Sequence, residues 1–328
     1  MQTDTFRTPI SIPEQAFRIS HTHSLCCMGS CFAENMGGLF AAHKFQVSVN
    51  PTGILFNPLS IADSLNRAAE AADIEEGELF FHDGCWHHPA FHSRFSHPDK
   101  NVCLNQLRQS VQQTHAFLQH TDLLILTFGS NGVYRLKESG EVVANCHKLP
   151  AERFERQQLK VEAMRPIIEN ALLKVKSLQP SLRCLLTVSP VRYLQTDFSD
   201  NSYSKACLRM LAHDLCESHS WISYFPAFEI LMDDLRDYRF YAADRIHPSE
   251  EAVRYLWDCF GSAFFTEETR TLNRRIEAVE AAFHHRTAFP GTEEDKRFRA
   301  RSLEQLRQLR REHPYLDFSE EETHFLSL

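Results

Sequence analysis

The sequence predicts an α/β fold, a three-layer sandwich in which helices cover both faces of a central parallel sheet. The first observation is that short apolar runs alternate with longer segments of helical period from about residue 24 to residue 264. The second is a nearly continuous apolar run at residues 123–128, which is typical of a strand covered on both faces. Functional side chains in such a sheet are expected at the carboxyl ends of the strands.

The first strand, turn and helix of this alternation carry two candidate nucleophiles. Residues 25–28 predict a short buried strand, and apolar residues recur at helical spacing over residues 32–45. Gly29 permits a sharp turn between them, because it has no Cβ to clash. A strand, a tight turn and a helix in succession expose a nucleophile at the top of a parallel sheet, and this turn holds Ser30 and Cys31. An ordinary β–α turn with a small capping residue is the alternative.

The other elements of the sandwich follow from the same patterns. Further strands are expected at residues 45–49, 123–128, 184–188 and 222–226. Further helices are expected at residues 57–72, 104–119, 159–178, 202–218 and 250–264. Paired apolar runs around Asp83 and Gly84 predict a β-hairpin flap, inserted at about residues 78–100.

The sequence becomes more charged and its apolar residues become sparse after about residue 265, where we place the end of a main domain of residues 1–265. Residues 266–328 predict a C-terminal helical extension, with charged helices at 272–285 and 293–312. Such helices pack on the core or on another subunit, so a homo-oligomer formed through them is one expected assembly. The arginines of the second helix are interpreted as a solvated face.

Charge and the start of the sequence exclude several classes of partner. The formal net charge of -8 argues against a nucleic-acid partner bound through the whole surface. Residues 1–20 contain no apolar signal-peptide core, and no apolar run approaches transmembrane length. We therefore expect no membrane partner and a cytoplasmic location.

Cysteine and histidine patterns give little support for a metal site. The ten cysteines are scattered and form no CxxC pair. Five histidines lie in the flap, but no carboxylate or cysteine stands among them at a ligand-like helical spacing. These histidines are His82, His87, His88, His92 and His97. We expect no metal and no cofactor.

Five blocks of the sequence carry a family resemblance. They are residues 29–33, 50–58, 91–96, 145–150 and 238–249. The first block, Gly-Ser-Cys-Phe-Ala, is the signature that names the GSCFA family, which the sequence resembles over roughly residues 20–260. That family is similar to a branch of the SGNH (GDSL-like) hydrolases. The resemblance implies a flavodoxin-like arrangement of the sandwich and an acyl hydrolase that acts on ester bonds.

The resemblance also implies roles for residues that lie far apart in the sequence. Asp244 and His247 match the SGNH motif that supplies an orienting carboxylate and a general base. Gly53 matches a glycine whose N–H contributes to the oxyanion hole, and Asn131 matches an asparagine whose amide is the third donor. Alternatively, Gly53 only forms a turn, and the Asp-x-x-His segment only marks a capped helix start.

Two registers of the SGNH signature compete for the nucleophile. In the first, Cys31 attacks, and its thiol pKa is lowered by a helix N-terminus and by a neighbouring histidine. In the second, Ser30 attacks and Cys31 is a buried packing residue. The first register is preferred.

The flap and a later loop supply the residues expected to contact the substrate. They are His92, Ser93 and Arg94 in the flap, and Asn145, His147 and Lys148 in the loop. The expected substrate is a small-molecule or glycan acyl ester. One alternative is an acyltransferase that uses a carbohydrate acceptor and an acyl donor such as acyl-CoA, because transfer and hydrolysis share an acyl-enzyme. A catalytically silent SGNH-like binding module is the other alternative.

Overall fold

A five-stranded parallel sheet forms the centre of the protein. The computed structural model describes residues 7–326 except residues 14, 195–196 and 287. The strands are β1 (Ser24–Gly29), β2 (Gln46–Val49), β5 (Leu123–Phe128), β9 (Arg183–Val188) and β10 (Ile222–Tyr224). They lie in the order β10-β9-β5-β1-β2, and each neighbouring pair is parallel.

This strand order is the flavodoxin-like one, because the five strands follow the sequence 2-1-3-4-5 when they are counted along the chain. The direction of winding therefore reverses between β1 and β5. In open parallel sheets of this kind, ligands bind at the carboxyl ends of the strands beside that reversal. Gly29 lies opposite Thr127 in this register, so the turn after β1 sits at the reversal point.

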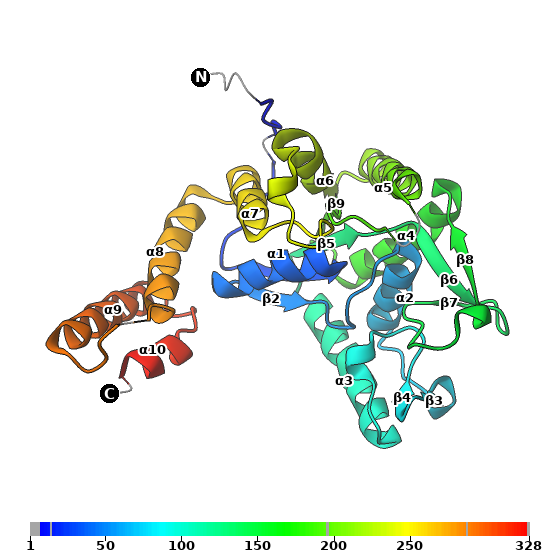
Figure 1. Cartoon of the computed structure of the whole chain (residues 1–328), viewed down its shortest axis with the longest axis horizontal. Helices are drawn as coiled ribbons and strands as arrows, with labels where there is room; N and C mark the ends of the chain where they lie inside the picture. The colour runs from blue at the N-terminus through cyan, green and yellow to red at the C-terminus, as the bar shows by residue number, and fades with distance from the viewer. Residues whose placement is uncertain (1–6, 14, 195–196, 287, 327–328) are drawn as a thin grey trace.

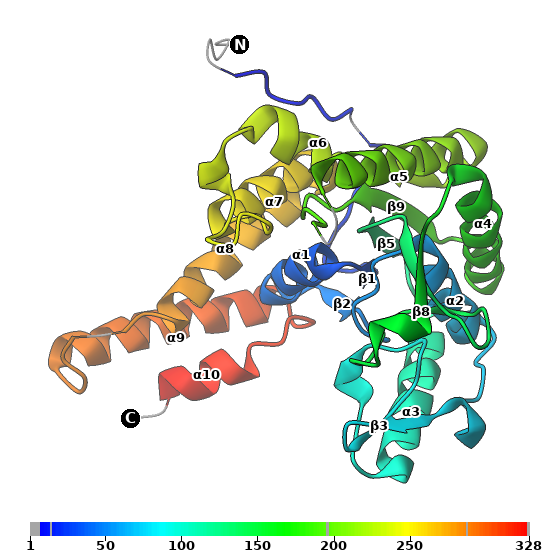
Figure 2. The ribbon, with the colours of Figure 1, turned by 45° about the vertical axis from the view of Figure 1, so that its right-hand side comes forward.

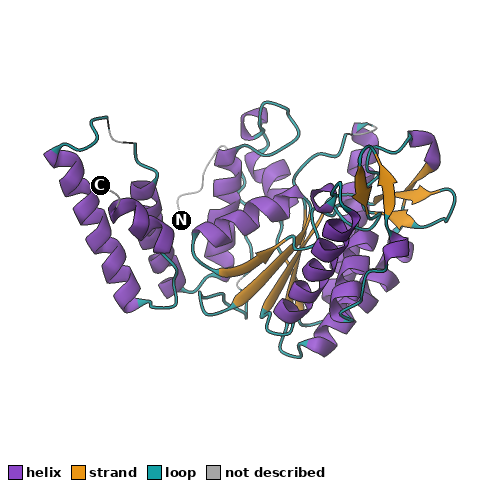
Figure 3. Cartoon of the chain, turned by 90° about the horizontal axis from the view of Figure 1, so that it is seen from below, coloured by secondary structure: helices purple, strands orange, loops and turns teal. Residues whose placement is uncertain are grey.

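The apolar strands are buried on both faces, as the sequence predicts. Alternate side chains point to opposite faces of a strand. Cys26 and Leu124 pack in the core that contains the side chains of α2, α4 and α5, whereas Cys27 and Ile125 pack against α1 and α7. Figure 3 shows the helices on both sides of the sheet, so the predicted three-layer sandwich is confirmed.

The helices begin at polar caps. The helices of the sandwich are α1 (Cys31–Ala42), α2 (Pro58–Ala69), α3 (Lys100–Leu118), α4 (Val161–Leu178), α5 (Phe198–Ser218) and α7 (Glu250–Phe264). Asn57, Asp197 and Ser249 each accept a backbone N–H through the side chain at the start of a helix. A short helix α6 (Ala227–Glu229) continues into a π-helical segment, Ile230–Leu235.

The predicted hairpin is present, and it is anchored on a helix. Strands β3 (Phe80–His82) and β4 (Cys85–His87) pair antiparallel around Asp83 and Gly84. Beside it, Leu79 and Phe91 pack with Leu104 and Leu107 of α3 in a separate apolar cluster. Figure 1 shows this unit below the sheet. The hairpin itself therefore packs on α3, and the segment that follows it reaches the first β–α turn.

A second small sheet occupies the region where we expected a loop, before the helix predicted from residue 159. It comprises β6 (Gly132–Leu136), β7 (Val142–Val143) and β8 (Phe154–Gln158), in the antiparallel order β7-β6-β8. Expecting a helix from residue 159 was close, because α4 begins at Val161. The strand β8 was missed because its sequence, Phe-Glu-Arg-Gln-Gln, is mostly polar.

The C-terminal extension consists of α8 (Glu267–Phe283), α9 (Glu293–Glu312) and α10 (Ser319–Leu326). These helices share their own apolar cluster, which includes Ile276, Leu306 and Phe325. Figure 2 shows them to one side of the sheet, beside the end of α1. His43 bonds to Glu277 at 2.9 Å, and Lys44 bonds to Glu321.

Part of the basic stripe on α9 is exposed, as expected, and also pairs with a carboxylate of another helix. Arg310 Nη1 lies 2.5 Å from Glu322 Oε2, and Arg307 Nε lies 3.3 Å from the other oxygen of that carboxylate. Helix α10, which the sequence reading missed, supplies this carboxylate. No helix among the residues that the structure describes is both long and apolar enough to cross a membrane.

Candidate active site

The turn after β1 is fixed by contacts on both sides. Gly29 has a φ of +135°, and a Cβ on it would lie 2.2 Å from the carbonyl oxygen of Thr127. Its N–H donates to Asn50 Oδ1 at 2.8 Å, and its carbonyl accepts the N–H of Leu55 at 2.9 Å. Only glycine fits this backbone. The turn is therefore pressed against the end of β5 and tied to the loop after β2.

The two candidate nucleophiles differ in how they are held. Ser30 is only 1% exposed, and its hydroxyl caps α1 by accepting the N–H of Phe32 at 3.3 Å. Cys31 is the first residue of α1 and is partly exposed. The geometry therefore leaves the thiol more accessible than the hydroxyl.

The electrostatic surroundings of Cys31 correct one expectation from the sequence. Burial raises the pKa of the Cys31 thiol above its ordinary value. The N–H groups of Cys31 and Phe32 and the charge of Lys205 act in the opposite direction, while Glu34 raises the pKa further. A thiol partly ionised near neutral pH was expected, but desolvation outweighs the helix N-terminus in the free protein.

Asp244 and His247 form a closely bonded pair. His247 Nδ1 lies 2.7 Å from Asp244 Oδ2. The other carboxylate oxygen accepts the N–H groups of Ile246 and His247 at 2.9 and 3.0 Å. The bond to His247 and these two N–H groups lower the pKa of Asp244 to about 2. The carboxylate is thus ionised at neutral pH and fixes Nδ1 of the imidazole as the donor.

The loop that carries this pair is tied to the end of β9. Arg192 donates its N–H to Ile246 O and its Nη1 to Arg245 O, both at 3.2 Å. Its guanidinium lies over the ring of Tyr241, 4.0 Å from the centroid. Because Arg192 follows β9, the Asp244–His247 pair and the Gly29 turn belong to the same edge of the sheet. The His247 side chain is 45% exposed, and its Nε2 accepts or donates no hydrogen bond within the described part of the chain.

Gly53 and Asn131, the predicted second and third donors of the oxyanion hole, already donate hydrogen bonds to backbone carbonyl groups. The Gly53 N–H donates to Asn50 O at 2.8 Å within the turn. Asn131 is fully buried, and its amide nitrogen donates to Leu159 O at 2.9 Å. In this structure both groups stabilise local backbone rather than face an open site.

The predicted flap residues reach the site by different routes. A Cβ on Gly53 would lie 2.1 Å from the Cβ of His92, so this glycine permits the flap segment to approach the loop after β2. Arg94 donates to Asn50 O and lies 3.8 Å from Glu34. Ser93 is exposed. The structure thus brings His92 and Arg94 to the first β–α turn.

The predicted loop residues pack against the hairpin instead. His147 is buried, and its Nε2 bonds to His88 O at 2.9 Å. Asn145 accepts the N–H of His147 through its side chain at 2.8 Å. Lys148 is exposed and lies 4.0 Å from Asp83. The contacts of this loop hold the hairpin in place, and none of them reaches Cys31 directly.

Two buried histidines predict acid sensitivity of the fold. Burial lowers the pKa of His21 and of His147 from 6.5 to about 4. The unfolded chain therefore binds more protons, and stability falls as the pH decreases through the window from 6.5 to 4. We expect each histidine to reduce the free energy of unfolding by about 2 kcal/mol between pH 7.5 and pH 5. Urea unfolding at the two pH values measures this loss.

His21→Phe is the control for that measurement. Phenylalanine retains a ring against Phe45, which lies 4.1 Å from the His21 centroid, but it has no proton to bind. The pH-dependent loss should shrink by about 2 kcal/mol in this variant. An unchanged loss would show that His21 is not the titrating group.

Sequence reasoning missed the roles of two residues that organise the turn. Asn50 is fully buried, and its side chain joins the Gly29 N–H to Glu34 Oε2 at 2.8 Å each. Lys205 is buried behind the turn and donates to Gly129 O and Ser189 O. A signal for Lys205 was present, because it precedes Leu208 and Ala212 on the apolar stripe of its helix.

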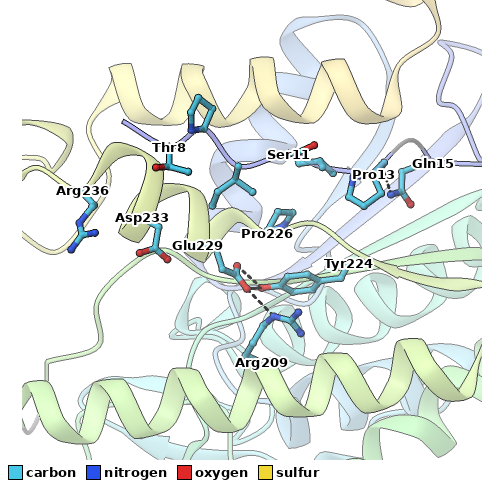
Figure 4. Close-up of a pocket in the computed structure, with 13 residues that line it drawn as sticks. Thr8, Ser11, Pro13, Gln15, Arg209, Tyr224, Pro226, Glu229, Asp233 and Arg236 are labelled. Atoms are coloured by element: carbon cyan, nitrogen blue, oxygen red, sulfur yellow. Dashed lines mark hydrogen bonds and ion pairs between the residues drawn. The ribbon is translucent and has the colours of Figure 1, made fainter. Parts of the chain in front are cut away.

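A cavity of about 850 Å³ lies away from this site. It is an open cavity lined by the N-terminal segment, α5 and the segment after β10. Figure 4 shows Glu229 between Tyr224 and Arg209, with bonds of 2.8 Å to the phenol and 2.7 Å to the guanidinium. None of the predicted site residues lines this cavity.

Comparison with known proteins identifies the family. A model of the GSCFA family matches residues 24–260, and a model described as the C-terminal domain of GSCFA domain proteins matches residues 264–328. A comparison with curated proteins finds no match. The first model covers more than half of the 328 residues and includes the Gly29 turn and the Asp244–His247 pair. The chain is therefore a member of the GSCFA family.

Proposed function

We propose that this protein is an SGNH-like acyl hydrolase in which Cys31 attacks an ester or thioester carbonyl. His247 transfers protons, and Asp244 holds its tautomer. The observation that carries the proposal is a shared location. A helix-N-terminal thiol follows β1 at the reversal point of a flavodoxin-like sheet, and an Asp–His pair bonded at 2.7 Å is tied to the segment after β9 at the same edge.

The choice of Cys31 over Ser30 rests on accessibility and on hydrogen bonding. The Ser30 hydroxyl is buried and caps α1, so attack by Ser30 would require the cap to open. The Cys31 thiol is partly exposed, and two backbone N–H groups stabilise its ionised form. A thiolate is also an intrinsically strong nucleophile.

The oxyanion would be met first by the backbone N–H of Cys31. That N–H makes no hydrogen bond to another residue in the described ranges, and it lies at the N-terminus of α1. Gly53 becomes a second donor only if its turn bond to Asn50 O opens. Asn131 is the weakest candidate, because its amide bonds to Leu159 O.

A neighbouring groove supports a glycan ester as the substrate. A cavity of about 650 Å³ lies between β2, the flap and α3, and it shares Arg94 with the site. Its wall includes Phe95 and the exposed amides of Gln106, Gln109 and Gln113. Amide and guanidinium donors beside an aromatic ring suit a chain of sugar hydroxyls, because they supply hydrogen bonds and a flat apolar surface.

The test of this proposal is hydrolysis of p-nitrophenyl acetate. We expect His247→Ala to lower kcat/KM by about 10²-fold or more, because His247 is the proposed proton carrier. Asp244→Asn should lower it by a similar factor while leaving the bond to Nδ1 geometrically possible, since an amide cannot stabilise an imidazolium as a carboxylate does.

Arg239→Ala is a control from the same segment, because Arg239 is an exposed cation in the short 3-10 helix Tyr238–Phe240, outside the proposed machinery. Its kcat/KM should equal that of the wild type. Equal turnover by the wild type and His247→Ala would leave the hydrolase proposal without support. Addition of a carbohydrate acceptor to the same assay distinguishes transfer from hydrolysis, because an acylated sugar then appears as product.

A further inference from the structure

Lys205 carries a buried amine that bonds to no carboxylate in the described part of the chain. Its residue is 2% exposed, and it lies on α5, which packs on the face of the sheet opposite α1. Nζ donates to the carbonyl oxygens of Gly129 and Ser189, each at 2.8 Å. No acidic side chain bonds to it among the residues that the structure describes. Burying a lysine without a carboxylate costs free energy, so a functional role for this amine is worth seeking.

The two carbonyl groups place this amine at the strand ends beside the nucleophile. Gly129 and Ser189 directly follow β5 and β9. A Cβ on Gly129 would lie 3.2 Å from the Cβ of Ser30, so the residue that binds the amine also contacts the turn. Two of the hydrogen positions of Nζ are thereby occupied. The third position holds a proton in the ammonium form and a lone pair in the amine form.

Cys31 is the ionisable group whose charge acts on the Lys205 amine, within the described part of the chain. Burial lowers the pKa of Lys205 to about 7, and the charge of the Cys31 thiolate raises it. The same interaction lowers the pKa of Cys31, against the effects of burial and of Glu34 on α1. An amine that is partly neutral near pH 7 can accept a proton, whereas an ordinary surface lysine cannot.

We propose that Lys205 is the base that takes the proton of the Cys31 thiol and then holds the thiolate as its counter-cation. The proposal rests on the proposed function, in which Cys31 attacks. The S–H bond breaks, an N–H bond forms on Nζ, and thiol plus amine become thiolate plus ammonium without a change in total charge. When the thiolate later leaves the acyl carbon, the proton returns to sulfur.

This assignment separates the proton transfers of the reaction. The thiol proton stays with Lys205 on the buried side of the turn. His247, on the exposed side, exchanges protons with the oxygen atoms of the reaction. It gives a proton to the leaving alkoxide and takes one from the attacking water. The raised pKa of the Cys31 thiol in the free protein is then no obstacle, because a dedicated base is in place.

The first experiment measures how fast iodoacetamide alkylates Cys31 as a function of pH, with peptide mass spectrometry to identify the labelled cysteine. Lys205→Met should raise the midpoint of this profile by at least about one pH unit and slow labelling at pH 7 by about tenfold. Lys176→Met is the matched control, because Lys176 also donates to a backbone carbonyl, Leu182 O at 2.8 Å, but lies on α4. Its profile should equal that of the wild type. Identical profiles for Lys205→Met and the wild type would overturn the proposal.

A second measurement does not depend on the folding of a Lys205 variant. In protein labelled with [13Cε]lysine, NMR should show one lysine that titrates near pH 7, well below the ordinary range near pH 10. Cys31→Ala should lower that midpoint, because it removes the thiolate that favours the ammonium. If every lysine titrates above about pH 9, or if the low midpoint is unchanged in the Cys31→Ala variant, Lys205 is not the base.

The outcomes for the two proposals are distinguishable. Coupled titration of Lys205 and Cys31 without turnover of any ester would support the pair and contradict the hydrolase. Ester turnover that requires Cys31, together with the same pH profile of Cys31 alkylation in Lys205→Met and the wild type, would support the hydrolase and overturn the role of Lys205.

Discussion

Cys31→Ala is expected to lower kcat/KM for p-nitrophenyl acetate by about 10³-fold or more, whereas Ser30→Ala should lower it by less than about tenfold. The thiol is the partly exposed group at the N-terminus of α1, and without it no acyl-enzyme forms. Ser30→Ala removes a capped hydrogen bond instead. It should therefore destabilise the fold by about 1 kcal/mol and leave the nucleophile in place.

Two controls make this comparison decisive. Cys146→Ala removes another partly exposed cysteine, in the loop that packs on the hairpin, and should keep wild-type turnover. Urea unfolding of each variant separates lost activity from lost folding. Full activity in Cys31→Ala together with inactivity in Ser30→Ala would move the nucleophile back by one residue and make Cys31 a packing residue.

The parts of the fold that the sequence predicted are those where a local pattern is enough. The apolar run at 123–128 and the helical spacing of apolar residues around α1 and α7 indicate a buried strand and buried helix faces. Apolar residues mark such burial directly in the sequence. The strands β7 and β8 were not predicted because β7 is short and β8 is mostly polar. Their pairing with β6 is decided by tertiary contacts. Helix α10 was not predicted because it is short and its first turn is acidic.

Candidate site residues could be proposed from the sequence only where the residue type and its motif indicate a chemical role. Cys31, Asp244 and His247 were proposed because they match the SGNH motifs, and the strand-end rule predicts one shared edge for them. The sequence could not reveal that the Asn131 amide bonds to Leu159 O, since the partner is far along the chain. It also could not show that Asn50 joins the Gly29 N–H to Glu34. Hydrogen-bond partners distant in sequence are fixed only by the three-dimensional packing.

The Gly29 turn yields the largest expected effect on stability. Gly29→Ala places a Cβ 2.2 Å from Thr127 O on a backbone with φ +135°, and the neighbour is main chain that cannot move aside. The turn must then shift away from β5, which breaks the bonds that it makes with Asn50 and Leu55. We expect a loss of about 4 kcal/mol or more in the free energy of unfolding, or no folded protein at all.

Gly38→Ala is the matched control, because Gly38 lies only nine residues further along the sequence, inside α1. It is exposed, its φ is outside the left-handed region, and a Cβ there would meet no atom within 4 Å. Alanine is the better helix former, so this variant should gain about 0.5–1 kcal/mol. Urea unfolding followed by circular dichroism measures both variants in the same chain. Equal stability of Gly29→Ala and the wild type would mean that the turn after β1 is not held against Thr127, and the placement of Cys31 at the reversal point of the sheet would lose its support.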